Sequence, residues 1–136
     1  MNVEEALSKL KEGNARFVAG NPSAKDLVSQ RQSLVSGQAP YAIVLTCSDS
    51  RVSPEHIFDA GLGEIFVVRT AGNIADAIAL GSIEYAAEHL GSQLLVVMGH
   101  ESCGAVKAAC GSDHAPGNID AIVKELQPAV QAGGKD

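Results

Sequence analysis

Three short runs of apolar residues recur along the chain, separated by longer segments whose apolar positions follow a helical spacing. The runs are YAIVLT at residues 41–46, EIFVVR at 64–69 and LLVVM at 94–98. Within each run the apolar residues are nearly continuous rather than alternating with polar ones, which is typical of strands buried on both faces of a sheet. We therefore predict three buried strands.

The intervening segments have the spacing of amphipathic helices. Residues 2–20 form one such segment, which ends near Gly20, and residues 76–90 place apolar side chains on one helical face before Gly91. Strands that alternate with helices predict right-handed crossovers and parallel pairing. The expected fold class is α/β, with a parallel sheet core, flanking helices and an N-terminal helix. A length of 136 residues suits a single domain, residues 1–136.

The composition of the chain excludes several classes of partner but does not by itself indicate a function. The net charge is −6, no basic run occurs and aromatic residues make up only 4%, so we expect no nucleic-acid partner. The sequence has neither the pattern of a signal peptide at its start nor an apolar run of 18 residues, so we expect a cytoplasmic protein with no membrane partner. Three cysteines fit a disulfide framework poorly and are better explained as core, metal-binding or catalytic residues.

Candidate chemistry follows the first and third predicted strands. Cys47, Asp49 and Arg51 come directly after the first strand, and His100 and Cys103 follow the third. Ligands of open parallel sheets bind at the carboxyl ends of the strands, where the strand order reverses. If the first strand lies between the other two, the two loops meet. Two thiolates and one imidazole are a known zinc ligand set that leaves one position open.

Each of these residues also has an ordinary structural explanation. Cys47 alone could be a small core residue, and Asp49 with Arg51 could form a surface ion pair. Arg69, at the end of the second strand, could be structural or anion-binding. The remaining histidines and Cys110 are expected to be structural or solvated.

The segments CSDSRVSPEHIF, FVVRTAGN, GSIEYAAEHL and GHESCGAV together resemble a beta-class carbonic anhydrase, over residues 6–130. The resemblance implies reversible hydration of carbon dioxide to bicarbonate by zinc-bound hydroxide. It implies that the zinc ligands are Cys47, His100 and Cys103. Asp49 would orient the hydroxide and Arg51 would hold Asp49 ionised, unless Asp49 swings onto the zinc in a closed state. Val44 stands where the bicarbonate-inhibited subtype has tryptophan, which favours the open state.

The resemblance also implies a substrate pocket and an assembly. The expected pocket residues are Gln38, Phe66, Ala71, Tyr85 and Gly104. Gln38, Phe66 and Tyr85 would come from the neighbouring subunit of a homodimer or higher homo-oligomer, although they could also be ordinary core or loop residues. Carbon dioxide and bicarbonate are the expected small-molecule partners.

One departure from the family pattern keeps other functions open. Family members usually continue into a further parallel strand, whereas this sequence ends at Asp136, so we expect the C-terminal strand region to be lacking and the strand at 94–98 to expose an edge. A non-catalytic, zinc-stabilised assembly or binding module of the same fold is therefore one alternative. A hydrolase of carbon disulfide or carbonyl sulfide is another, because the same attack by hydroxide would serve it.

Overall fold

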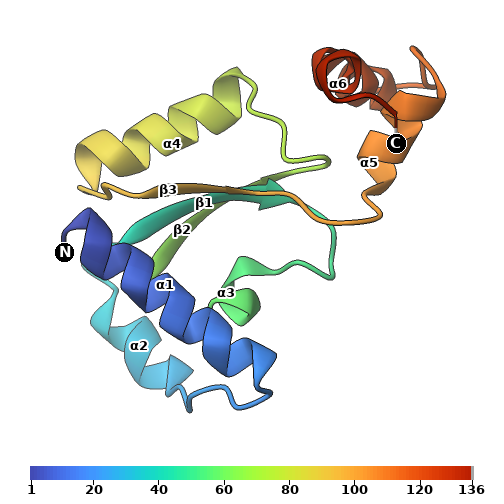
Figure 1. Ribbon diagram of the computed structural model, residues 1–136. Coiled ribbons are helices and arrows are strands. Elements are labelled where there is room, and N and C mark those ends of the chain that lie inside the picture. Colours follow the sequence, from blue (N-terminus) through green and yellow to red (C-terminus); the bar gives the residue numbers. More distant parts are fainter. Residues whose placement is uncertain (136) are drawn as a thin grey trace.

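A computed structural model describes residues 1–135 of the chain. Its centre is a three-stranded parallel sheet with the strand order β2-β1-β3 (Figure 1). The strands are β1 (Ala42–Cys47), β2 (Ile65–Thr70) and β3 (Leu95–Met98). Each begins one residue after its predicted start, and every residue of the central strand β1 is buried. The predicted α/β class is confirmed, and the condition that the first strand lies between the other two is met.

The register of the sheet brings the carboxyl ends of the strands to one edge. Thr46 of β1 pairs with Arg69 of β2 and with Met98 of β3, and Cys47 pairs with Thr70. The Thr46 hydroxyl also donates a hydrogen bond to the Met98 carbonyl oxygen at 2.9 Å. The loops that follow the three strands therefore leave the sheet side by side, as the sequence predicted.

Helices cover both faces of the sheet (Figure 1). On one face lies α4 (Ala77–His89). On the other face lie α1 (Val3–Val18), α2 (Leu27–Ser33) and the single turn α3 (Pro54–Ile57). Successive side chains of β1 point to opposite faces. Val44 packs in a cluster with Leu10 of α1, whereas Leu45 packs with Ala79 of α4. A strand that serves two cores must be apolar at nearly every position, which explains the unbroken run in the sequence.

The two long flanking helices begin at polar capping residues. The Asn2 side chain accepts a hydrogen bond from the Glu5 backbone N–H, and the Glu5 carboxylate accepts one from the Asn2 backbone N–H, which is a complete capping box. At the start of α4 the Asp76 carboxylate accepts a hydrogen bond from the Ala79 backbone N–H at 2.8 Å, a side-chain cap without the reciprocal bond.

The last two helices form a small unit beyond the carboxyl ends of the strands (Figure 1). They are α5 (Gly104–Gly111) and α6 (Ile119–Gly133). Their shared core contains Ala109, Val123, Leu126 and Val130. Because α5 begins directly after Cys103, this unit anchors the C-terminal end of the loop that carries His100 and Cys103.

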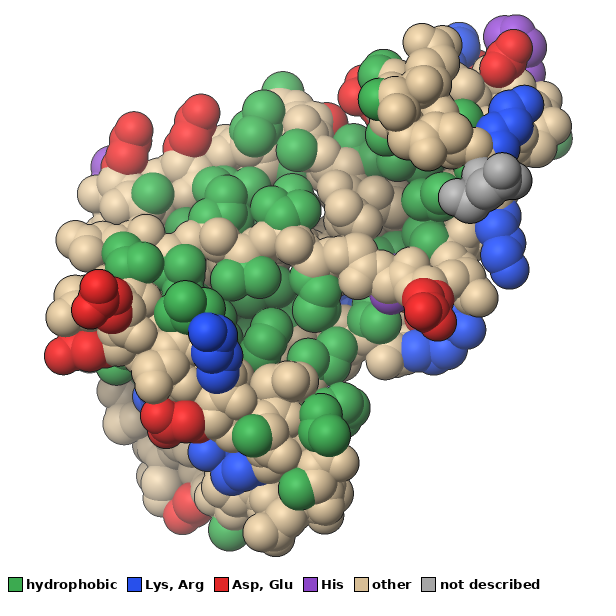
Figure 2. Space-filling view, in the orientation of Figure 1, with side chains coloured by type: hydrophobic (Ala, Val, Ile, Leu, Met, Phe, Trp, Pro, Cys, Tyr) green, Lys and Arg blue, Asp and Glu red, His purple; other side chains and the backbone are tan. Residues whose placement is uncertain are grey.

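Within residues 1–135, β3 pairs only with β1, so its other edge is open, as the sequence suggested. The Leu95 and Val97 side chains are 44% and 60% exposed. Figure 2 shows hydrophobic side chains gathered in a band between α1 and α4, where β3 lies in Figure 1. Among residues 1–135, no helix is long and apolar enough to cross a bilayer.

Candidate metal centre

Two cysteines and one histidine meet at the carboxyl edge of the sheet. Cys47 is the last residue of β1, His100 follows β3, and Cys103 occupies the N-cap position of α5. One ligand atom from each of the three residues lies within 4.8 Å of those of the other two, and the two Sγ atoms are 3.9 Å apart. Both thiols are buried. The predicted convergence of the two loops is therefore observed.

His100 is oriented by a backbone carbonyl. Its Nδ1 lies 2.9 Å from the Glu101 carbonyl oxygen. Since a carbonyl can only accept, Nδ1 carries the proton in this contact and Nε2 keeps a free lone pair. Among the described residues, His100 Nε2 is the one buried side-chain nitrogen or oxygen without a hydrogen-bond partner. A buried acceptor nitrogen without a hydrogen-bond partner, beside two thiols, has the chemistry expected of a metal ligand.

The Cys47 thiol is surrounded by groups that favour its ionised form. Burial opposes ionisation, but the backbone N–H groups of Gly72 and Asp49 point at Sγ from 3.3 and 3.4 Å. Together with His100 and Cys103 they lower the pKa of Cys47 to about 7. A thiolate is the form that binds metal.

Asp49 lies beside this group but is bound to Arg51. Asp49 Oδ1 accepts hydrogen bonds from the Arg51 backbone N–H and from Arg51 Nε, both at 2.9 Å, and Oδ2 accepts one from Arg51 Nη2 at 2.6 Å. These bonds hold the pKa of Asp49 well below its usual range. Asp49 Oδ2 is 3.9 Å from His100 Nε2. The carboxylate therefore flanks the candidate ligands and remains ionised at neutral pH.

The predicted pocket residues fall into two groups in a single chain. Ala71 and Gly104 lie next to the candidate ligands, because Ala71 precedes the Gly72 amide that binds Cys47 and Gly104 follows Cys103. Phe66 lies near the start of β2, four positions before the Thr70 that pairs with Cys47, which is about 13 Å along a strand. Its ring lies 6.2 Å from that of Tyr85 in α4, between ring centroids. Gln38 precedes β1, at the opposite end of the strand from Cys47.

Several groups that shape the site were not predicted from the sequence. The Gly72 amide, the Glu101 carbonyl and the Thr46 hydroxyl each fix a ligand or its loop. The Gly72 amide and the Glu101 carbonyl are backbone groups, which every residue possesses. Their roles therefore could not be predicted from the residue types in the sequence. Arg69, which the sequence left as structural or anion-binding, donates hydrogen bonds to the backbone of the Cys47 loop.

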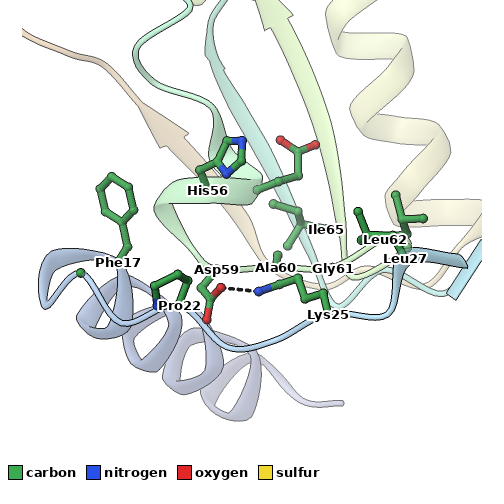
Figure 3. A pocket seen from close by; sticks show the side chains of 13 residues that line it. Phe17, Pro22, Lys25, Leu27, His56, Asp59, Ala60, Gly61, Leu62 and Ile65 are labelled. Atoms are coloured by element: carbon green, nitrogen blue, oxygen red, sulfur yellow. Dashed lines mark hydrogen bonds and ion pairs between the residues drawn. The ribbon is translucent and has the colours of Figure 1, made fainter. Parts of the chain in front are cut away.

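One surface hollow reaches the candidate metal ligands, and a second, larger cavity lies away from them. An open hollow of about 490 Å³ is lined by His100, Cys103, Val106 and Cys110 among others, and it gives access to the candidate ligands. A second cavity of about 630 Å³ lies between α1, α2 and the turn after α3 (Figure 3). Phe17, Leu27 and Ile65 line it, and Asp59 is paired there with Lys25. It shares no lining residue with the first hollow.

Comparison with known proteins shows the family of the chain. The family model described as carbonic anhydrase matches residues 42–136. Over 140 aligned positions, the chain is 48% identical to carbonic anhydrase 2 of Mycobacterium tuberculosis, covering 99% of this chain and 68% of that protein. It is also 48% identical to a carbonic anhydrase of Mycolicibacterium smegmatis, with 98% and 68% coverage.

Solved structures define the class. A Coccomyxa beta-carbonic anhydrase in complex with acetazolamide superposes with a TM-score of 0.72 at 31% identity, covering 94% of this chain and 59% of that one. A tetrameric beta-carbonic anhydrase from Sordaria macrospora superposes with a TM-score of 0.70 at 28% identity, with 95% and 64% coverage. The chain belongs to the carbonic anhydrase family, in its beta class. It spans about three fifths of the length of these two solved chains.

Proposed function

We propose that this chain binds Zn²⁺ through Cys47 Sγ, His100 Nε2 and Cys103 Sγ, and catalyses the reversible hydration of carbon dioxide to bicarbonate. The observation that carries the proposal is the buried, unpartnered Nε2 of His100 beside two thiols whose sulfur atoms are 3.9 Å apart. A set of two thiolates and one imidazole suits zinc better than the harder cations, which prefer oxygen ligands. Three protein ligands leave a fourth position for water or substrate, as catalytic zinc sites require.

When bound, Zn²⁺ would act as a Lewis acid that makes water acidic enough to supply hydroxide near neutral pH. The chain's own contribution would come from Asp49. Its Oδ1 already accepts two hydrogen bonds and its Oδ2 only one, so Oδ2 keeps acceptor capacity on the side of His100. An ionised carboxylate can only accept, so Asp49 would take the hydrogen bond of the attacking water and fix its orientation toward the carbon atom. Arg51 would keep Asp49 ionised and away from the thiolates.

We further propose that the working form is a homo-oligomer. Tyr85 is 47% exposed, and its ring lies between those of Phe66 and His89, at centroid distances of 6.2 and 5.5 Å. This exposed aromatic group and Gln38 lie far along the sheet from Cys47 of the same chain, which is consistent with their serving the site of a second copy. The related Sordaria macrospora proteins are tetrameric.

The test is a joint measurement of zinc, activity and mass on the purified chain. We expect one zinc ion per chain by elemental mass spectrometry, carbon dioxide hydration above the buffer rate by stopped flow from pH 7 to 9, and an oligomer by native mass spectrometry. Zinc without hydration across that range would instead support the non-catalytic, zinc-stabilised module. Absence of bound zinc after reconstitution would contradict the proposal altogether.

A further inference from the structure

Arg69 spans the gap between β2 and the loop that follows β1. Its Nε donates a hydrogen bond to the Cys47 carbonyl oxygen at 2.9 Å, and its Nη2 donates one to the Asp49 carbonyl oxygen at 2.7 Å. The side chain is half-buried. Among residues 1–135, no carboxylate oxygen lies within ion-pair distance of Arg69. Two hydrogen bonds of this guanidinium are therefore directed at main-chain carbonyls, and both carbonyls belong to residues of the candidate site.

The loop needs such a support because the sheet stops holding it after one residue. The Ser48 N–H donates to the Thr70 carbonyl at 2.9 Å, which is the last backbone bond between β1 and β2. Beyond it, the Asp49 carbonyl accepts from the Val52 N–H at 3.2 Å, a contact within the loop itself. Arg69 thus supplies the connection from Asp49 back to the sheet. The fork of the guanidinium spans the two carbonyls at once, which fixes their spacing as well as their position.

We propose that Arg69 is a positioning residue that sets the directions of the Cys47 and Asp49 side chains toward the metal. The inference rests on the proposed zinc site. The direction of a side chain depends on the orientation of the backbone at its own residue. Arg69 fixes that orientation for Cys47 and Asp49 by binding the carbonyl oxygens of both. Zinc requires Cys47 Sγ at about 2.3 Å, so a loop free to shift by a fraction of an ångström would bind metal less well. Loss of such a supporting contact typically weakens metal affinity by roughly 10- to 100-fold.

The test compares Arg69→Met and Arg69→Lys with Arg31→Met, an exposed arginine in α2, as the matched control. Zinc affinity is measured by competition with a chromophoric chelator. The coordination geometry is measured from the visible spectrum of the Co²⁺-substituted chain. The melting temperature of the metal-free chain reports stability separately. We expect Arg69→Met to weaken zinc binding by roughly 10- to 100-fold and to alter the Co²⁺ spectrum. Arg69→Lys should be intermediate, since an ammonium group cannot match the two-carbonyl fork. Arg31→Met should change neither.

A purely structural role for Arg69 predicts a different result. Arg69→Met would then lower the melting temperature of the metal-free chain and leave both zinc affinity and the Co²⁺ spectrum as in the parent, which would overturn the proposal. If Arg69→Met does not fold, parent-like affinity and spectrum in Arg69→Lys would do the same. Hydration by the parent is measured in parallel. An inactive parent whose Co²⁺ spectrum still depends on Arg69 would refute the proposed activity and leave this inference standing.

Discussion

Arg51 binds Asp49 across a spacing of only two residues, with three hydrogen bonds that occupy both carboxylate oxygens. The backbone N–H of Arg51 and its Nε share Oδ1, and Nη2 takes Oδ2. Because the guanidinium and the carboxylate lie on the same tight turn, the contact needs no distant part of the fold to form. It keeps the carboxylate ionised, and Oδ2, which accepts only one of the three bonds, keeps acceptor capacity on the side of His100.

This relationship predicts the behaviour of Asp49→Asn. The variant should keep its zinc, since Asp49 is not among the three candidate ligands, but it should lose hydration activity by at least about tenfold. An amide offers one acceptor oxygen, and its NH₂ group cannot accept from Arg51. Elemental analysis and stopped-flow hydration measure the two effects. Parent-like activity in the variant would remove Asp49 from the mechanism.

Cys47 and Cys110 should differ clearly in their effect on metal binding. Cys47→Ser should lose most of its zinc, because a hydroxyl is a far weaker zinc ligand than a thiolate. Cys110→Ser is the matched control, since Cys110 lies on α5 outside the group of candidate ligands and packs against the α5–α6 core. It should bind zinc like the parent. Equal zinc content in the two variants would contradict the ligand assignment.

A mixing experiment tests whether Tyr85 serves a neighbouring site. Asp49→Asn and Tyr85→Ala should each be poorly active as pure proteins. If a site combines Asp49 of one subunit with Tyr85 of the other, a mixed dimer contains one site with both parental residues and one with neither. Dissociating and reassembling the two variants together should therefore restore activity. If Tyr85 serves the site of its own chain, no mixed dimer has an intact site and the mixture stays as inactive as its components.

Two glycines in helices predict opposite effects of the same substitution. A Cβ at Gly13 of α1 would lie 1.8 Å from the Phe58 carbonyl oxygen, whereas a Cβ at Gly81 of α4 would meet nothing within 4 Å. Gly81→Ala should raise the free energy of unfolding by up to about 1 kcal/mol through helix propensity. Gly13→Ala should lower it by roughly 1–3 kcal/mol, because α1 must shift away from the turn after α3. Denaturant unfolding at one protein concentration would measure both. Similar values for the two variants would mean that α1 does not pack against Phe58.

Asp59 should make the stability of the fold sensitive to acid. Its buried carboxylate binds Lys25, the backbone N–H and hydroxyl of Ser23, and Arg16 Nε at 2.5 Å. The hydrogen bond from Lys25 has the largest effect, followed by those from Ser23 and Arg16, and together they hold the pKa of Asp59 well below its usual range. Unfolding returns the pKa to about 3.9, so this contribution is complete above about pH 5 and is lost as the pH falls through 4 and below.

The corresponding variant is Asp59→Asn. Its melting temperature should fall less steeply between pH 5.5 and pH 3 than that of the parent, because the variant has no carboxylate to protonate there. Asp113→Asn, which removes an exposed carboxylate without an ion pair in the described chain, is the control and should follow the parent. Identical slopes for the parent and Asp59→Asn would show that the Asp59 cluster does not stabilise the fold.

The sequence by itself determined the strands, the class of fold and the edge of the sheet where the candidate metal ligands lie. Unbroken apolar runs follow from burial on both faces, and the residues directly after parallel strands lie at one edge, so the sequence placed Cys47, His100 and Cys103 at that edge. That they meet there depends on β1 lying between β2 and β3, which the tertiary structure decided. The Asp49–Arg51 contact is also local. The tertiary structure alone decided how these groups are aimed. The Glu101 carbonyl turns His100, the Gly72 amide faces the Cys47 sulfur, and Arg69 holds two carbonyls of the loop. A backbone group is the same in every residue, so its contribution depends on how the chain folds around it and leaves no mark in the sequence.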